Sequence, residues 1–271
     1  MLGKAKVLAL HAGYAYSACM SLLSQVAYPS DGAITIRVEL PPAEAHVLPG
    51  HPWGDAGGLF TPAYWAANSR LFAATSDAKP HRLGGSLAEE MAACLLGGYG
   101  MPAELGLAAF ARLRGDGLLY AGVSAAKLEG ALSHPFRVNG RIIHYRFPRQ
   151  KARYLADCLV AIDRKDLVAA TGRYLRDALQ EFPGIGPKTA SWIARNWLDA
   201  DDVAILDVHI VHAMKLLSLI ESVVLPRDYG TVEAIFLRFA NAVGVRPSIL
   251  DAVMWQHMRR WGYLASTRLA G

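Results

Sequence analysis

Two residues of this chain, Lys188 and Asp207, are of types that could carry out covalent chemistry together. Lys188 lies in the motif Phe-Pro-Gly-Ile-Gly-Pro-Lys-Thr at 182–189, and Asp207 lies in the otherwise apolar stretch 203–208. A lysine amine is a nucleophile once desolvation and nearby positive charge, including the dipole of a helix start, lower its pKa. A carboxylate can stabilise developing positive charge or accept a proton from the amine. The pair therefore predicts nucleophilic amine chemistry.

The glycine turn before the lysine predicts an anion site. Gly184 and Gly186 flank one apolar residue between two helical patterns, so the backbone there can approach a partner closely. The N–H groups that open the following helix point outward and attract anions, and phosphate is their natural ligand. Lys188 then lies on the first turn of that helix. An amine and a carboxylate near a phosphate site indicate chemistry on a nucleic acid.

This pattern resembles the helix-hairpin-helix-Gly/Pro-Asp superfamily of base-excision DNA glycosylases, and within it the 8-oxoguanine DNA glycosylase branch. The resemblance rests on 182–189 and on Asp207 and His209, covers roughly 145–215, extends to the C-terminus, and is topological before residue 85. It implies that Lys188 is the nucleophile, that Asp207 is the second catalytic residue, and that His209 contacts a backbone phosphate. The alternatives are a phosphate contact for Lys188, a helix cap for Asp207 and a structural role for His209.

The resemblance implies a bifunctional enzyme of DNA repair. The amine would displace the damaged base, leave an imine to the opened sugar and allow strand cleavage by β-elimination, which is AP lyase activity. The expected substrate is double-stranded DNA containing an oxidised purine, 8-oxoguanine first of all. Two alternatives stay open: a glycosylase for alkylated or otherwise modified bases, and a non-catalytic hairpin protein that binds DNA.

The hairpin, expected at 176–198, is also a candidate DNA and cation site. The resemblance implies that its backbone and the residue after Lys188 contact DNA through Gly184, Ile185, Gly186 and Thr189. It further implies a structural K⁺ or Na⁺ on the carbonyls of Gln180, Phe182 and Ile185. We expect no other cofactor. The three cysteines, Cys19, Cys94 and Cys158, are far apart, so neither zinc nor an iron–sulfur cluster is expected.

A basic run precedes the hairpin. It contains six cationic residues and no acidic residue, with Tyr145 and Phe147 interleaved: Arg137, Arg141, Arg146, Arg149, Lys151 and Arg153. Such a run suits a DNA backbone and an opened duplex, although an ordinary solvated face is the alternative. Within it, the segment 150–154 resembles the family segment that fills the gap left by an extruded base, and Gln150 and Lys151 stand where that segment has a tyrosine and an arginine, so the preferred opposite base stays open.

The expected base pocket departs from the family. Trp192 stands where eukaryotic 8-oxoguanine enzymes have a small residue, and Asp251 and Trp255 stand where they have a glutamine and a phenylalanine. We expect the two tryptophans to stack on a flipped base and Asp251 to accept hydrogen bonds from its N–H groups. The alternatives are core positions for the tryptophans and a helix cap for Asp251.

These residues require a mainly helical fold with minor strands. Helical patterns are expected at 86–96, 103–114, 149–160, 165–180, 187–198, 208–219, 228–242 and 247–261. A strand is expected at 34–40, and a β-hairpin at 136–145 with Asn139-Gly140 at its turn. Trp53, Phe60, Tyr64 and Trp65 are expected to form a small core.

We expect a partly β N-terminal region at 1–85 and a helical glycosylase module at 86–271. The excess of 28 Lys and Arg over 23 Asp and Glu, with a pI of about 9.1, suits a DNA partner but carries little weight. The apolar run 7–10 stops at His11, so neither secretion nor a membrane span is expected. An intracellular monomer, in the cytoplasm and nucleoid or in the nucleus, is the expected form.

Overall fold

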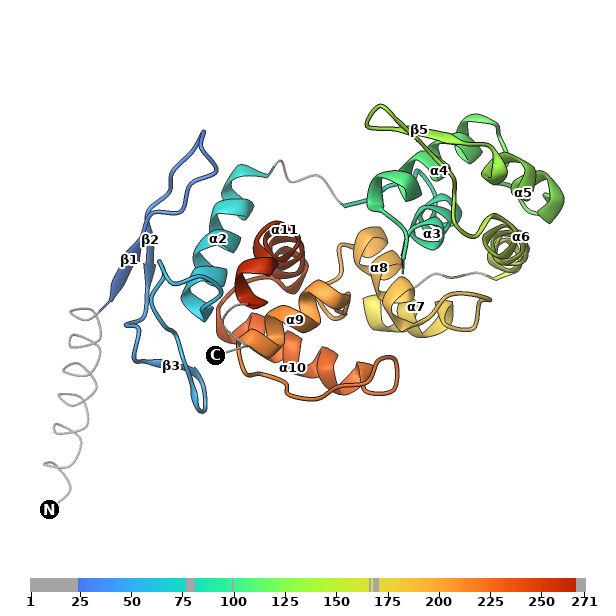
Figure 1. Cartoon of the computed structure of the whole chain (residues 1–271). Coiled ribbons are helices and arrows are strands. Elements are labelled where there is room, and N and C mark those ends of the chain that lie inside the picture. Colours follow the sequence, from blue (N-terminus) through green and yellow to red (C-terminus); the bar gives the residue numbers. More distant parts are fainter. Residues whose placement is uncertain (1–23, 77–80, 99, 166, 168–170, 267–271) are drawn as a thin grey trace, which may run out of the picture. The chain divides into compact units, whose positions relative to one another are not determined.

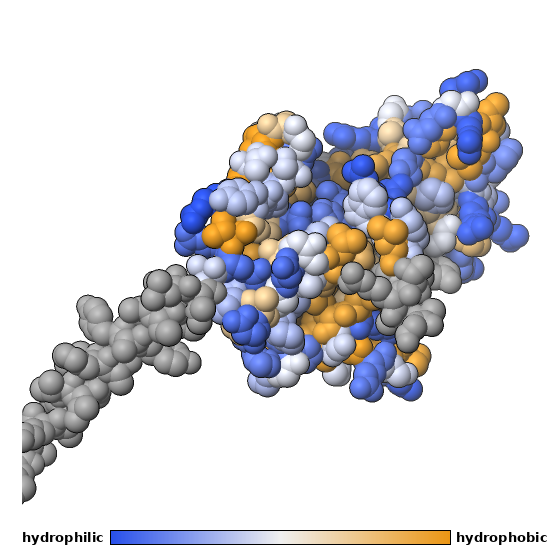
Figure 2. Space-filling model, turned by 60° about the vertical axis from the view of Figure 1, so that its left-hand side comes forward, coloured by the Kyte–Doolittle hydropathy of each residue, from blue (hydrophilic) through white to orange (hydrophobic). Residues whose placement is uncertain are grey.

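The computed structural model describes residues 24–76, 81–98, 100–165, 167 and 171–266 (Figure 1). The apolar run at 7–10 and Cys19 lie outside them. The described part is mainly helical, with ten helices and three two-stranded antiparallel sheets. This confirms the expected fold class. None of the described helices has the length and apolar character needed to cross a membrane, and hydrophilic side chains cover much of the face in Figure 2.

Residue contacts divide the chain into two compact units. The terminal unit combines the described parts of Met1–Ala78, Val208–Val223 and Arg238–Gly271, and the central unit comprises Lys79–Asp207 and Val224–Leu237. The polypeptide passes between them directly after Asp207, after Val223 and within α10 (Tyr229–Ala242). Residues from both ends of the sequence thus build the terminal unit.

The terminal unit carries two small sheets. β1 (Gln25–Ala27) pairs with β2 (Val38–Leu40), and β3 (His46–Leu48) pairs with β4 (His51–Pro52). The strand predicted at 34–40 is regular only over its last three residues, where buried and exposed side chains alternate. Its first half pairs irregularly with the preceding segment, through the isolated Ser30–Thr35 bridge and a hydrogen bond from the N–H of Ile36 to the carbonyl of Pro29 at 3.2 Å, on either side of a turn where Gly32 has a positive φ of 95°.

Three whole helices and the last residues of α10 complete the terminal unit; the whole helices are α2 (Pro62–Thr75), α9 (Val208–Leu216) and α11 (Pro247–Ser266). The helix α2 was not predicted, although Thr61 caps it and proline occupies its first position, both recognised start signals. The expected aromatic core is confirmed, since Trp53, Phe60 and Trp65 are buried. Tyr64 extends this core to α11, where its hydroxyl group lies 2.7 Å from Nδ1 of His257.

The central unit begins with α3 (Leu87–Leu96) and α4 (Ala103–Gly115), both close to their predicted bounds. The Ser86 side chain caps α3 by accepting the N–H of Glu89, as expected from the capping box. β5 (Phe136–Val138) and β6 (Arg141–Ile143) form the predicted hairpin. Asn139 and Gly140 have φ values of 50° and 76° at its turn, as a two-residue turn of this kind requires.

The remaining central helices are α5 (Ala125–Ser133), which was not predicted, α6 (Pro148–Arg164), α7 (Gly172–Leu179) and α8 (Pro187–Leu198). The helix α8 has its predicted bounds. The helix predicted at 165–180 begins later, because Thr171 adopts an extended conformation and caps the chain there. Likewise α9 ends before the predicted residue 219, and Ser218 has a left-handed φ of 54°.

Candidate active site

The turn between α7 and α8 is anchored by two buried side chains and shaped by two different glycines. Phe182 and Ile185 are each 4% exposed and belong to the central core, and the N–H of Ile185 donates to the carbonyl of Phe182 at 3.1 Å. Gly184 has a φ of 75°, and a Cβ built there would lie 2.2 Å from the Tyr154 ring on α6. Gly184 is therefore required by the fold itself.

Gly186 has no such structural reason. It caps α8 in an extended conformation, with a φ of −89° and without a side-chain cap. A Cβ built on Gly186 would meet nothing within 4 Å, and the residue is exposed. An N-terminal helix end with open space at its first backbone groups suits an anion such as phosphate. The arrangement has the geometry expected for close approach of a ligand.

Lys188 and Asp207 both lie in the central unit. Lys188 is the second residue of α8 and is half-buried, with Thr189 beside it equally half-buried. Asp207 is half-buried and follows the buried segment 203–206, directly before the first residue of α9. Both side chains therefore stand at a helix start, where the positive end of the helix dipole attracts anions.

Buried polar contacts fix α8 from its other end. The carboxylate of Glu90, which is fully buried, accepts from the Nδ2 of Asn196 at 2.6 Å and from the N–H groups of Leu83 and Gly84 at 2.6 and 2.9 Å. The guanidinium of Arg82 donates twice to the carbonyl of Trp197 near the helix end. These contacts, which the sequence did not reveal, hold the helix that carries Lys188.

The basic run divides into exposed and engaged residues. Arg137, Arg141, Arg149 and Arg153 are exposed, and so is Gln150. Lys151 instead donates from Nζ to the carbonyl of Leu95 at 2.6 Å, and burial lowers its pKa. Tyr145 is buried and donates to the carbonyl of Leu96 at 2.6 Å. Thus Lys151 and Tyr145 satisfy the carbonyls that end α3, and contact of Lys151 with an orphaned base stays a prediction.

The three predicted pocket residues are divided between the two units. Trp192, in the central unit, is half-buried and lies against Gly97, where a Cβ would be 3.2 Å from its ring. In the terminal unit, Asp251 is 5% exposed and lies within α11, four residues after its first residue. The capping alternative for Asp251 is therefore excluded. Joint stacking of Trp192 and Trp255 stays a prediction.

Trp255 and His209 lie together in the terminal unit. Their ring centroids are 6.4 Å apart in an edge-to-face arrangement, and the guanidinium of Arg259 lies 5.1 Å from the centroid of the Trp255 ring. Arg259 was not predicted from the sequence, although its position four residues after Trp255 on a helix places the two side chains on the same face, where a cation–π contact can form. The candidate phosphate contact and one candidate stacking residue are thereby neighbours.

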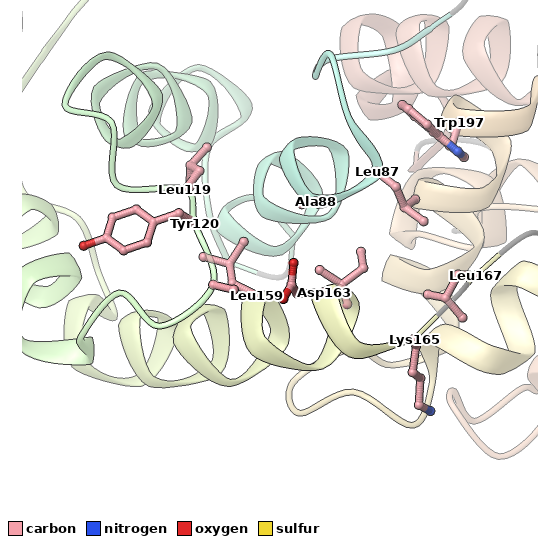
Figure 3. Close-up of a pocket in the computed structure, with 11 residues that line it drawn as sticks. Leu87, Ala88, Leu119, Tyr120, Leu159, Asp163, Lys165, Leu167 and Trp197 are labelled. Carbon is pink, nitrogen blue, oxygen red and sulfur yellow. The ribbon is translucent and has the colours of Figure 1, made fainter.

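A separate cavity of about 540 Å³ opens in the central unit (Figure 3). Mostly apolar side chains of α3, α6 and the loop before α5 line it, and Asp163, Lys165 and Trp197 also belong to its lining. Lys188, Asp207 and Trp192 are not among its lining residues. The cavity is therefore distinct from the candidate catalytic residues.

Comparison with known proteins agrees with the hairpin motif. The family model described as 8-oxoguanine DNA glycosylase matches residues 79–245. Two relatives named 8-oxoguanine DNA glycosylase/AP lyase, from Thermoplasma volcanium and Thermotoga maritima, are each 31% identical, over 114 and 122 residues. These matches cover 41% and 42% of this chain and 55% and 58% of the relatives. The chain is thus matched over little more than half of their length.

Solved structures give the same result. The 8-oxoguanine DNA glycosylase of Methanocaldococcus jannaschii has a TM-score of 0.52 at 28% identity, covering 64% of this chain and 78% of that one. The glycosylase/lyase of that organism in complex with DNA containing 8-oxoguanine has a TM-score of 0.51 at 25% identity, covering 74% and 89%. Because the family model matches more than half of the sequence, the chain belongs to the 8-oxoguanine DNA glycosylase family.

Proposed function

We propose that the chain is a DNA glycosylase with AP lyase activity that excises 8-oxoguanine from double-stranded DNA. The observation that carries the proposal is the position of Lys188 on the first turn of α8, directly after the open Gly186 turn. A phosphate held at that turn would bring the sugar of a neighbouring nucleotide to the amine. The relatives' names and the DNA in the neighbouring structure support this substrate.

In the proposed reaction, the lone pair of Lys188 Nζ attacks C1′ of the nucleotide and the bond from C1′ to the base breaks. The electrons of that bond leave with the base, which takes up a proton. Loss of a proton from the amine and opening of the sugar ring give an imine between C1′ and Nζ. The imine makes the C2′ proton acidic, and its removal expels the 3′ phosphate. Water then hydrolyses the imine and frees the lysine.

Asp207 would stabilise the positive charge that develops on the sugar or accept a proton from Lys188. Its place before α9 and after a buried segment suits a carboxylate that stabilises nearby positive charge. Trp255, Trp192 and Asp251 would receive the extruded base, and His209 would contact a phosphate next to it. The exposed residues Arg149, Gln150 and Arg153 would follow the DNA backbone and the gap in the duplex.

A monovalent cation would fit the carbonyls of Gln180, Phe182 and Ile185. Gln180 ends α7, where backbone carbonyls are left over, and Phe182 retains a second lone pair beside its bond from Ile185. An ion there would neutralise these carbonyls and steady the turn. Replacement of K⁺ by tetramethylammonium at constant ionic strength should weaken DNA binding; unchanged affinity would count against the site.

We propose that the enzyme acts as a monomer inside the cell, where its DNA substrate lies.

Borohydride trapping tests the proposed reaction. Wild-type chain incubated with an 8-oxoguanine duplex and borohydride should form a covalent adduct, because borohydride reduces the imine to a stable amine. Lys188→Gln should abolish the adduct while retaining DNA binding. Lys215→Gln, which removes a lysine from α9, is the matched control and should trap normally. Binding of the duplex by the wild type without an adduct or released base would refute the proposal.

The same assay separates the alternative substrates. Duplexes with alkylated bases, and with each of the four bases opposite 8-oxoguanine, should be compared at equal enzyme concentration. Excision of 8-oxoguanine in preference to alkylated bases supports the proposal. Excision of alkylated bases without trapping would assign the chain to another branch of glycosylases.

A further inference from the structure

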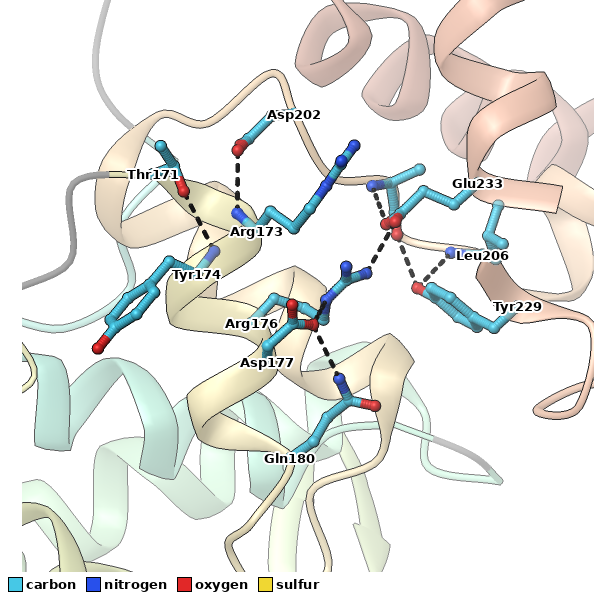
Figure 4. Close-up of polar contacts among 11 residues, drawn as sticks. Thr171, Arg173, Tyr174, Arg176, Asp177, Gln180, Asp202, Leu206, Tyr229 and Glu233 are labelled. Carbon is cyan, nitrogen blue, oxygen red and sulfur yellow. Dashed lines mark hydrogen bonds and ion pairs between the residues drawn. The ribbon is translucent and has the colours of Figure 1, made fainter. Parts of the chain in front are cut away.

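A buried ion pair joins the helical hairpin formed by α7 and α8 to the segment that ends at Asp207 (Figure 4). Nη1 of Arg176 on α7 donates to Oε2 of Glu233 on α10 at 2.8 Å, and the two side chains are 10% and 5% exposed. The other carboxylate oxygen, Oε1, accepts the N–H of Ala204 at 3.0 Å. Glu233 therefore connects the first hairpin helix to the segment 203–206.

Tyr229, one turn earlier on α10, holds the same segment by two more hydrogen bonds. Its hydroxyl donates to the carbonyl of Ala204 at 2.6 Å and accepts the N–H of Leu206 at 3.2 Å. Ala204 and Leu206 are 2% and 1% exposed, so these backbone groups need partners within the protein. Two side chains of α10 thus determine where the last buried residue before Asp207 lies.

The network also reaches the hairpin turn. Nε of Arg176 donates to Oδ1 of Asp177 at 2.5 Å, and the Nε2 of Gln180 donates to the same oxygen at 3.4 Å. Gln180 is the residue that ends α7 and begins the turn leading to Lys188. A continuous set of polar contacts therefore runs from the hairpin turn to Ala204 and Leu206.

This arrangement is poorly explained by stability alone. A buried ion pair gains little net free energy, because desolvation of both charges offsets their attraction, whereas geometry is strictly specified once it forms. Catalytic groups must be held within a fraction of an ångström of their working position. We propose that Arg176, Glu233 and Tyr229 are positioning residues that fix Asp207 relative to the hairpin of Lys188. The inference rests on the proposed excision reaction.

Tyr229→Phe is the sharpest test, because it removes one hydroxyl and retains the ring. Under single-turnover conditions with saturating enzyme, we expect base release from an 8-oxoguanine duplex to slow about tenfold. Affinity for the same duplex, measured with Lys188→Gln in both backgrounds to prevent reaction, should stay within about twofold. Glu233→Gln should act in the same direction, because the amide nitrogen that replaces one carboxylate oxygen cannot accept a hydrogen bond, so either Arg176 or Ala204 loses its acceptor.

Two controls separate positioning from general loss of stability. Leu132→Ala opens a cavity in the core of the same unit and should lower the melting temperature without slowing base release at a temperature where it is folded. In the Asp207→Asn background, Tyr229→Phe should cause no further loss of rate, because the group that it positions is already disabled. Additive losses in that double variant would overturn the inference.

Amide hydrogen exchange supplies a readout independent of activity. Tyr229→Phe should accelerate exchange in a peptide spanning 203–207 and leave the peptide spanning 182–189 unchanged. If the wild type releases no base, the proposed function fails, while exchange still decides whether the network holds this segment. Unchanged exchange at 203–207, or faster exchange with an unchanged rate of base release, would overturn the inference.

Discussion

The two glycines of the α7–α8 hairpin, Gly184 and Gly186, differ in what an added Cβ atom would contact, so alanine substitution should affect stability differently at the two positions. In Gly184→Ala the new Cβ would overlap the Tyr154 ring and force a left-handed φ on alanine. We expect a loss of about 3 kcal/mol from the free energy of unfolding, measured by urea denaturation. The Cβ of Gly186→Ala meets nothing, so its stability should change by less than about 0.5 kcal/mol.

Gly186→Ala should weaken DNA binding although it leaves the free energy of unfolding almost unchanged. Its methyl group would occupy the space in which a phosphate must approach the start of α8, so affinity for duplex DNA should fall about tenfold in an anisotropy titration. Gly230→Ala is a suitable control, because its Cβ also meets nothing and it lies away from the hairpin in sequence. Normal DNA affinity in Gly186→Ala would show that phosphate does not bind at this turn.

At the same scale, the sequence predicted functional residues better than their partners. Lys188 and the turn before it form a local motif, so the helix start that carries the lysine was predicted to the residue. The contact that occupies Lys151 depends on a carbonyl 56 residues earlier, at Leu95. Likewise, Glu233 finds its partners 57 and 29 residues away. Such pairings depend on tertiary packing, so they cannot be predicted from the spacing of residues in a local sequence motif.

Among the elements, capping residues alone did not decide which helices were predicted. α3 and α8 begin at a serine cap and at a Gly-Pro pair, but the unpredicted helices α2 and α5 also begin at capping residues, Thr61 and Ser124. The strand predicted at 34–40 is shorter in the structure, because β2 is a regular strand only over the three residues that pair with β1. Local pattern therefore located most helices, and the length of each strand depended on its partner.

The contact between α2 and α11 should make stability sensitive to pH. Burial, and then the charge of Arg260, lower the pKa of His257, whose ring also contacts Tyr64 and Trp65. The unfolded chain then binds more protons than the folded one, so this part of the stability is present above pH 6.5, the ordinary pKa. It is lost as pH falls from there through the lower pKa of the folded state.

Urea denaturation at pH 7.5 and pH 5 checks this expectation. The wild type should lose more free energy of unfolding between these conditions than His257→Gln, which cannot titrate. His212, whose pKa is also lowered, is present in both proteins, so its contribution cancels in the comparison. Equal losses in the two proteins would show that His257 titrates alike in the folded and unfolded states.

For the whole molecule, the net charge of +5 bears on DNA binding through the few cations that can release counterions from phosphate. Arg149 and Arg153 are exposed on α6, whereas Lys151 is bonded to Leu95 and is partly desolvated. These three residues contribute equally to the net charge, but they differ in exposure and in their hydrogen bonds within the protein. Salt dependence of DNA affinity distinguishes them, because it counts phosphate contacts rather than charges.

We expect Arg149→Ala and Arg153→Ala each to reduce the slope of log affinity against log salt concentration by about 0.9, the value for one phosphate contact on duplex DNA. Lys151→Ala should leave this slope unchanged and lower the free energy of unfolding by about 1 kcal/mol, because the carbonyl of Leu95 loses its donor. Anisotropy titrations over a range of salt concentrations, with urea denaturation of each variant, measure both quantities. A slope reduced by Lys151→Ala would mean that this lysine leaves Leu95 and binds phosphate in the complex.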